Sequence, residues 1–190
     1  MGEAKRRQAC YEAMRRRKFR QGLEYWIFEP SAAEKVNFDE LNLIKPIEVG
    51  RMPAMNLEQG GFERGKCHDN AIRFERLTGG EWKAVLGWCI TIPSGDYLCH
   101  SVVTDGERWL CVTPTEDGSV LFFDFVPDPH LEIGDNVMFR RGEVVGPGLR
   151  RDPETTMAYV RYYLDRLEAG DSIEAMVQDM IEEAEGMFED

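Results

Sequence analysis

The spacing of apolar positions changes from helical to strand-like in the middle of the chain. Ala71, Phe74 and Leu77 recur at helical spacing after Cys67, and two consecutive glycines stop the pattern, which predicts a helix over 67–78. Four shorter apolar segments follow, separated by Pro-Ser-Gly, Asp-Gly and Glu-Asp-Gly turns. They predict strands over 85–92, 96–104, 107–113 and 119–126, arranged as an antiparallel meander.

Helical patterns also occupy both ends of the chain. Residues 3–20 contain no Gly or Pro and are rich in helix-forming residues. Near the C-terminus, Asp152 and Pro153 open a helix that Gly170 closes, and Ser172 caps a second helix with one apolar stripe. The stripe comprises Ile173, Met176, Val177, Met180, Ile181 and Ala184.

The segment between the first helix and Cys67 has weaker signals. The apolar run over 22–30 predicts a short strand, and Ser31 with Glu34 forms a capping box for a short helix. Residues 44–65 alternate Pro, Gly and polar positions and predict a surface connection. Together the elements predict an α+β fold, in which an antiparallel hairpin sheet packs on the Cys67 helix and terminal helices flank it.

Length and composition favour a globular protein. With 190 residues and 43% hydrophobic content, the chain is long enough to bury a core and is expected to form one domain. We divide it into a basic N-terminal helix over 1–22, an α+β core over 23–150, and an acidic helical pair over 151–190 that packs on the same domain.

Charge is distributed unevenly around a net value of −12. Residues 1–22 hold eight of the 23 Lys and Arg, whereas 171–190 hold eight acids and no Lys or Arg. The net charge argues against general nucleic-acid binding by the whole domain. One interpretation makes the basic N-terminal arm a contact to nucleic acid or the ribosome, or the acidic surface a binding site for a basic partner protein. The alternative is that both ends are solvated helix faces that attract each other.

Two features bear on the compartment. No apolar stretch approaches the ~20 residues that a membrane span requires, and no apolar segment follows the basic N-terminus as in a secretory signal. Five irregularly spaced cysteines, an odd number, fit reduced thiols better than a disulfide framework. The sequence therefore predicts a cytoplasmic protein without a membrane contact.

The candidate chemistry centres on Cys67. A free thiol has a pKa of ~8.5, and the positive potential at a helix N-terminus lowers that pKa and favours the nucleophilic thiolate. A neighbouring imidazole would complete the pair. His68 is adjacent, but consecutive residues on a helix point about 100° apart. His100, in the second predicted strand, is the better candidate.

Hairpin counting places three side chains in one row. With Asp105 and Gly106 central in a two-residue turn, His100 lies opposite Cys111, and the same count in the preceding hairpin sets Cys89 opposite His100. With Cys67 added, three thiolates and one imidazole form a ligand set for structural zinc. These ligands lack the short paired spacing of zinc motifs, and reduced cysteines are ordinary core residues, so zinc ranks third among our hypotheses.

The segments KCHDNA, GWCITI, HSVVTDGERWLCVTP and FVPDP resemble a group of bacterial and phage proteins that look like minimal papain-like or transglutaminase-like domains, and the opening MGEAKRR recurs in that group. The resemblance implies a papain-like fold, with Cys67 as nucleophile and His100 as base. In such domains the strand after the histidine commonly carries an aspartate that orients the imidazole, in a pattern like Asp-x-Thr-Pro. This sequence has Cys111 at that position.

Other side chains are candidates to support this site. Thr113 and Asp124 are candidates to orient the imidazole in place of the missing carboxylate. The Cys67 backbone N–H would stabilise an oxyanion, with Gln59 or Asn70 as side-chain helpers. Asn70 lies one helical turn after Cys67, so a hydrogen bond to local backbone is an equal expectation for it.

Three functional hypotheses follow. The first is a thiol-dependent hydrolase or acyl transferase, similar to a cysteine peptidase or amidase, which acts on a peptide, amide or acyl substrate and needs no cofactor. The second, from another class, is a non-catalytic papain-fold protein that binds a partner protein through its acidic surface. The third is a zinc-stabilised binding module.

Overall fold

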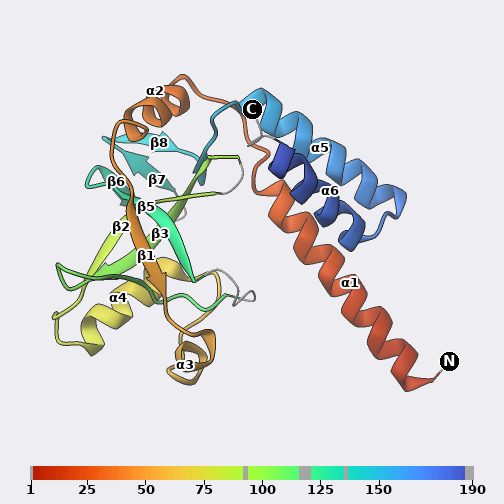
Figure 1. The fold of residues 1–190 in the computed structure, drawn as a ribbon, viewed down its shortest axis with the longest axis horizontal. Helices are drawn as coiled ribbons and strands as arrows, with labels where there is room; N and C mark the ends of the chain where they lie inside the picture. The colour runs from red at the N-terminus through yellow and green to blue at the C-terminus, as the bar shows by residue number, and fades with distance from the viewer. Residues whose placement is uncertain (1, 92–93, 116–120, 135–136, 187–190) are drawn as a thin grey trace. The chain divides into compact units, whose positions relative to one another are not determined.

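The computed structural model of the protein describes residues 2–91, 94–115, 121–134 and 137–186 (Figure 1). Its helices are α1 (Glu3–Glu24), α2 (Ala32–Leu41), α3 (Ala54–Gln59), α4 (Cys67–Leu77), α5 (Pro153–Ala169) and α6 (Ile173–Gly186). Its strands are β1 (Ile47–Arg51), β2 (Lys83–Ile90), β3 (Tyr97–Thr104), β4 (Trp109–Cys111), β5 (Phe122–Pro127), β6 (Leu131–Ile133), β7 (Met138–Arg140), β8 (Glu143–Val145) and β9 (Gly148–Leu149).

The chain forms two compact units. One contains α1, α5 and α6, and the other contains α2 to α4 and all nine described strands. This division differs from the three segments expected from the sequence, because the basic N-terminal helix and the acidic C-terminal pair belong to one unit. None of the helices within the described ranges combines the length and apolar character that crossing a lipid bilayer requires.

The helical unit has its own apolar core. Its buried side chains are Leu23, Val160, Tyr163, Leu167, Ile173 and Met176. The helix ends follow the sequence signals, since Asp152 accepts a hydrogen bond from the Thr155 N–H at 3.2 Å and Gly170 ends α5 at a φ of 99°. Ser172 Oγ accepts from the Ala175 N–H at 3.1 Å, which confirms the predicted cap of α6.

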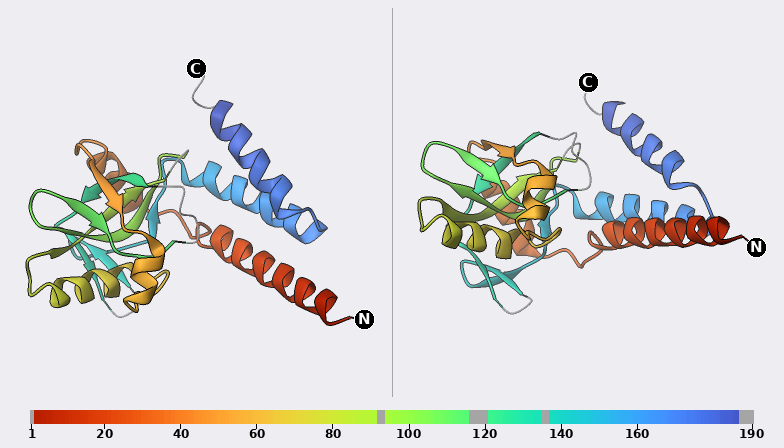
Figure 2. Two further views of the ribbon diagram at one scale, coloured as in Figure 1. Left: turned by 60° about the horizontal axis from the view of Figure 1, so that its bottom comes forward. Right: turned by 90° about the horizontal axis from the view of Figure 1, so that it is seen from below.

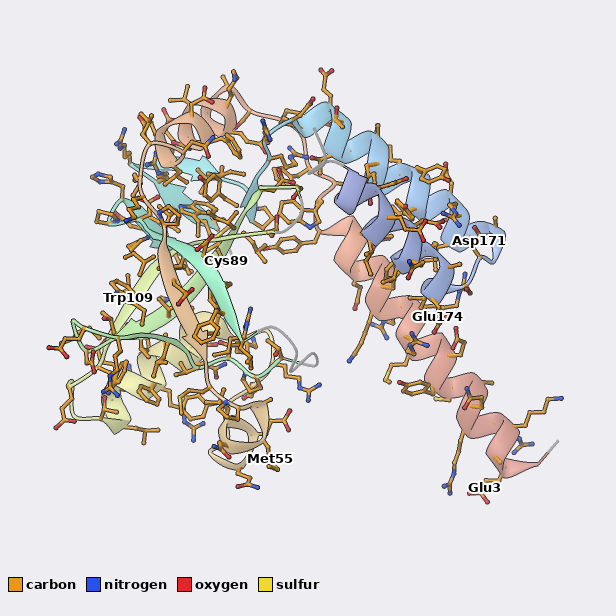
Figure 3. All side chains as sticks on the ribbon, in the orientation of Figure 1. Glu3, Met55, Cys89, Trp109, Asp171 and Glu174 are labelled. Atoms are coloured by element: carbon orange, nitrogen blue, oxygen red, sulfur yellow. The ribbon has the colours of Figure 1, made fainter. Side chains whose placement is uncertain are left out.

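Opposite charges meet within this unit. Arg15 of α1 pairs with Glu174 of α6 at 2.5 Å, and Arg20 pairs with Glu168 of α5 at 3.1 Å. Arg16 donates to backbone carbonyls at the C-terminal end of α5, where a helix is most negative. Figure 3 labels Glu174, which lies in the first turn of α6. The structure therefore supports mutual attraction of the two charged ends.

In the second unit, five strands close into a barrel. The strand order is β2-β5-β1-β4-β3, and β3 pairs again with β2, while β9 adds to the edge of β3. All these pairings are antiparallel except β1 with β4, which is parallel. The predicted meander is therefore wrong at one place, because β1 separates β4 from β5. Residues 44–65 were expected to be a surface connection, yet they supply this strand.

Side chains alternate between the interior and the exterior of the barrel. The interior holds Val49, Val102, Cys111 and Phe125, with Val85, Trp109 and Phe123 packed against them. On the exterior, α4 packs against β2 and β3 (Figure 1). Its Ala71 is buried with Val103 and Val112. Another exterior region holds Trp88, Tyr97 and Val126 under α2 and the small sheet. Adjacent residues of β3 thus face different surroundings.

Both hairpins that flank β3 differ from the predicted register by two residues. Thr104 pairs with Trp109 because a four-residue loop joins β3 to β4, and the Asp105 carboxylate holds that loop by accepting from the Arg108 N–H at 2.8 Å. Across β2 and β3, Gly87 faces His100 and Cys89 faces Leu98. A shift of two residues preserves the face on which each side chain lies.

The region after β5 forms a second sheet that the sequence patterns do not predict. Its strand order is β6-β7-β8, and it is antiparallel throughout. Its strands have three residues each, too few to show an alternating pattern. The short strand expected over 22–30 is also wrong, because α1 continues to Glu24 and a turn follows. The helix expected after Ser31 is confirmed as α2. Two turned views show the sheet and helices of each unit (Figure 2).

Candidate active site

Cys67 is the first residue of α4, as the apolar pattern predicts. Its side chain is partly buried, and three backbone N–H donors, those of Ser101, His68 and Cys67 itself, favour a negative charge on its sulfur. Burial raises the pKa of the thiol and outweighs these three donors, which lower it. Cys67 is therefore a neutral thiol at neutral pH, surrounded by groups that would stabilise a negative charge if one developed.

Ser101 contacts the start of α4 at a point where the pairing of β3 is interrupted. Along one side, β3 pairs with β9 through Tyr97 and Leu98, and with β4 through Val103 and Thr104. Ser101 lies between these two pairings, and its Oγ lies 3.3 Å from Nδ1 of His68 on α4. The start of α4 is thus fixed against the backbone that carries the neighbouring His100. His68 itself contacts Ser101 rather than the thiol.

His100 points into the barrel, on the face opposite to Ser101. Its Nε2 lies 3.2 Å from Sγ of Cys111, and its ring meets the ring of Phe123 edge to face at a centroid distance of 5.5 Å. No hydrogen bond joins the His100 ring to Cys67 within the described part of the chain. Cys89 and Trp109, labelled in Figure 3, come from two other strands that enclose this interior.

Arg51 ends β1 beside this histidine. Its Nη1 lies 3.5 Å from Sγ of Cys111, and its guanidinium lies over the Phe123 ring at 4.5 Å from the centroid. Burial, and to a smaller extent the Arg51 cation, lowers the pKa of His100 to about 4. The imidazole is therefore uncharged at neutral pH. Arg51 was not among the residues singled out from the sequence, since a single arginine at a strand end gives no signal.

The remaining predicted residues take mostly structural positions. Asn70 is buried and holds the loop before α4, because its Oδ1 accepts from the Glu63 N–H at 3.1 Å and its Nδ2 donates to the Glu63 carbonyl at 2.7 Å. The same Nδ2 lies 3.4 Å from Oγ1 of Thr113. The local backbone role expected as one alternative for Asn70 is the one observed, and Thr113 contacts Asn70 rather than His100.

The two other candidates lie elsewhere. Asp124 is exposed on β5, where it faces Glu48, while its neighbours Phe123 and Phe125 face the interior. It therefore does not orient His100. Gln59 is exposed at the end of α3. Neither Thr113 nor Asp124, the two predicted substitutes for a carboxylate, contacts the imidazole. The sulfur of Cys111 lies next to the ring instead.

The zinc hypothesis loses its geometric basis. It required Cys89, His100 and Cys111 in one row, but Cys89 faces Leu98, and burial raises the pKa of its thiol to about 12. Among the residues that the structure describes, no group of three or more His, Cys, Asp or Glu side chains is arranged to hold a metal ion. All five cysteines are free thiols.

A second polar cluster lies outside the barrel. Asp128 accepts from Trp88 Nε1 at 2.9 Å and from Arg140 Nε at 2.7 Å, and Arg140 also donates to Asn37 and Glu40. It borders a hollow of about 410 Å³, which is lined by Glu40, Leu43, Ile44, Asp128, Pro129, His130, Arg140 and Arg141. Because the charges of the cluster compensate one another, it joins α2 to the small sheet without presenting a free charge to a ligand.

Comparison with known proteins adds no relative to this picture. No family model, curated protein or solved structure significantly matches the chain. The geometry around Cys67 and His100 is therefore the basis for assigning a function.

Proposed function

We propose that this protein is a thiol-dependent hydrolase or acyl transferase of the papain-like or transglutaminase-like kind, with Cys67 as nucleophile and His100 as base. The observation that carries the proposal is the contact of Ser101 Oγ with His68 Nδ1 at 3.3 Å, which holds the start of α4 against the residue next to His100. The substrate class is an amide or a related acyl bond. The free cysteines further favour a reducing compartment such as the cytoplasm.

The protonation states suit a base that acts during attack. Burial keeps both the thiol and the imidazole neutral, so the resting pair is not an ion pair. As Cys67 Sγ attacks the acyl carbon, its proton passes to the imidazole, which later returns it to the leaving group. The backbone N–H groups at the start of α4 are the donors available to the oxyanion.

An acyl probe tests the proposal directly. The full chain is treated with p-nitrophenyl acetate, and the acetylated residue is identified by mass spectrometry. We expect acetyl-Cys67 and a burst of p-nitrophenolate, both lost in Cys67→Ala and reduced about 10²-fold in His100→Gln. Cys10→Ser is the matched control, because Cys10 is an exposed thiol on α1. Acetylation that spreads equally over the cysteines, or that persists unchanged in His100→Gln, would overturn the assignment.

A non-catalytic papain-fold binding protein is the second candidate. It is favoured by the raised pKa of Cys67 and by exposed apolar side chains that line the hollow near Asp128, Leu43 at 88% and Ile44 at 42% exposure. Such apolar surface is typical of a protein contact. Under this alternative the Cys67→Ala and His100→Gln variants release p-nitrophenolate from the acyl probe at the same rate as the unmodified protein.

A further inference from the structure

We propose that Cys111 is the positioning residue of His100, acting as a sulfur acceptor where a carboxylate would otherwise orient the ring, with Arg51 keeping the sulfur an acceptor. This inference rests on the proposed function for its catalytic meaning. Its structural content, the tautomer of His100, can be measured without any substrate.

Three contacts of the Cys111 sulfur bear on where its proton lies. Arg51 Nη1, at 3.5 Å, can only donate, and the Thr113 carbonyl, at 3.9 Å, can only accept. The thiol hydrogen is therefore directed to Thr113, and the sulfur lone pairs are directed to Arg51 and to His100. Nε2 of His100, at 3.2 Å, must then carry a hydrogen in order to complete the contact.

This arrangement selects one tautomer of the imidazole. A neutral imidazole carries one N–H and one lone pair, so a hydrogen on Nε2 leaves the lone pair on Nδ1. In the proposed reaction, the lone pair on Nδ1 is then the one available to accept the proton of Cys67 Sγ when the thiolate forms, and to return it to the leaving group when the acyl bond breaks. In the opposite tautomer Nδ1 carries the hydrogen and has no lone pair for this proton.

Aromatic contacts restrict the ring further. Phe123 meets the imidazole edge to face, and the Arg51 guanidinium lies over the same phenyl ring. Arg51 thus contacts both the residue that orients His100 and the residue that packs against it. The arginine also disfavours a second positive charge on the imidazole, which keeps the ring in its basic form.

Sulfur is a weaker acceptor than a carboxylate and carries no charge as a thiol, so it stabilises an imidazolium less. A carboxylate introduced at position 111 should therefore raise the pKa of His100 and speed acyl transfer to Cys67. We expect Cys111→Asp to accelerate acetylation about tenfold, since Arg51 would pair with the new carboxylate.

Nitrogen NMR of the histidine-labelled full chain tests the inference. We expect His100 to carry its hydrogen on Nε2, to keep it there in Cys111→Ser, whose hydroxyl can both accept and donate, and to lose this preference in Cys111→Val. In the same variants, acetylation of Cys67 should be retained in Cys111→Ser and fall at least about tenfold in Cys111→Val. Cys99→Val is the matched control, because it removes a different thiol, on the neighbouring strand β3, by the same substitution.

The outcomes separate this inference from the proposed function. A hydrogen on Nδ1 in the unmodified protein, or an unchanged tautomer in Cys111→Val, overturns the positioning role whatever the acyl probe shows. A hydrogen on Nε2 that depends on Cys111, together with no acetylation of Cys67, overturns the hydrolase and leaves the positioning contact intact. If Cys111→Val does not fold, the tautomer in the unmodified protein and in Cys111→Ser decides.

Discussion

The Sγ of Cys111 lies 3.2 Å from Nε2 of His100 in the interior of the barrel, where burial and Arg51 lower the pKa of the imidazole to about 4. A histidine whose pKa is lower in the folded than in the unfolded protein makes stability depend on pH. Between about pH 6.5 and pH 4 the unfolded chain binds a proton that the folded chain does not.

We therefore expect the free energy of unfolding to fall as pH decreases through this window. Between pH 6.5 and pH 5 the contribution of His100 is about 2 kcal/mol. Urea denaturation at both pH values measures it as the difference between the unmodified protein and His100→Gln. His130→Gln is the control, because His130 is exposed. An equal pH dependence in the unmodified protein and His100→Gln contradicts the burial of a neutral imidazole.

Gly87, which faces His100 across β2 and β3, should not tolerate a side chain. A Cβ at this position would lie 2.2 Å from the Val126 carbonyl oxygen and 2.7 Å from Phe125. We expect Gly87→Ala to lower the free energy of unfolding by about 2–3 kcal/mol. In contrast, Gly22→Ala in α1 meets no atom within 4 Å and should stabilise by about 0.5–1 kcal/mol. Similar effects at the two positions would contradict the close approach of β5 to β2.

The buried pair of Asp128 and Arg140 should be strongly coupled. Their side chains are each 2% exposed, and removal of the arginine leaves a buried carboxylate without its cation. We expect Arg140→Met to cost about 3–5 kcal/mol, and the double variant with Asp128→Asn to cost clearly less than the sum of the two single changes. Chemical denaturation of the unmodified protein, the two single variants and the double variant completes this double-mutant cycle. If the losses in the free energy of unfolding of the two single variants simply add in the double variant, the two side chains are not coupled.

Asn70 should matter through the loop that precedes Cys67. Loss of its two hydrogen bonds to Glu63 is expected to cost about 1–3 kcal/mol in Asn70→Ala and to slow acetylation of Cys67. Asn56→Ala on α3 is the control, because Asn56 is exposed and should change stability by less than about 0.5 kcal/mol. Unchanged acetylation in folded Asn70→Ala would show that the loop does not position the thiol.

Part of this fold follows from sequence alone. The helix that begins at Cys67, the strands β2 to β5, and the caps of α5 and α6 all follow from periodicity and turn residues. β1 does not, because a five-residue strand that contains a glycine and lies between Pro46 and Pro53 has little pattern. Its parallel pairing with β4 also depends on contacts distant in sequence. The strands β6 to β8 are too short to be recognised.

The site is predictable to a similar extent. Counting through two-residue turns gives the correct face for His100 and Cys111 and therefore their proximity, although both hairpins are shifted by two residues. The shift arises in loops held by side-chain bonds, such as Asp105 with Arg108, which turn statistics do not encode. Arg51 and Phe123 reach the site from strands whose neighbours in the sheet cannot be inferred from sequence.

The pH dependence of Cys67 acetylation by p-nitrophenyl acetate tests the central claim most directly. If His100 is the base, the rate should be constant from about pH 5 to pH 8 and should fall on an acidic limb near the imidazole pKa of about 4. His100→Gln should lose this plateau, and its rate should rise only as the thiol ionises above its usual pKa. Superimposable profiles for the two proteins, both following ionisation of the thiol, would contradict the assignment of His100 as the base.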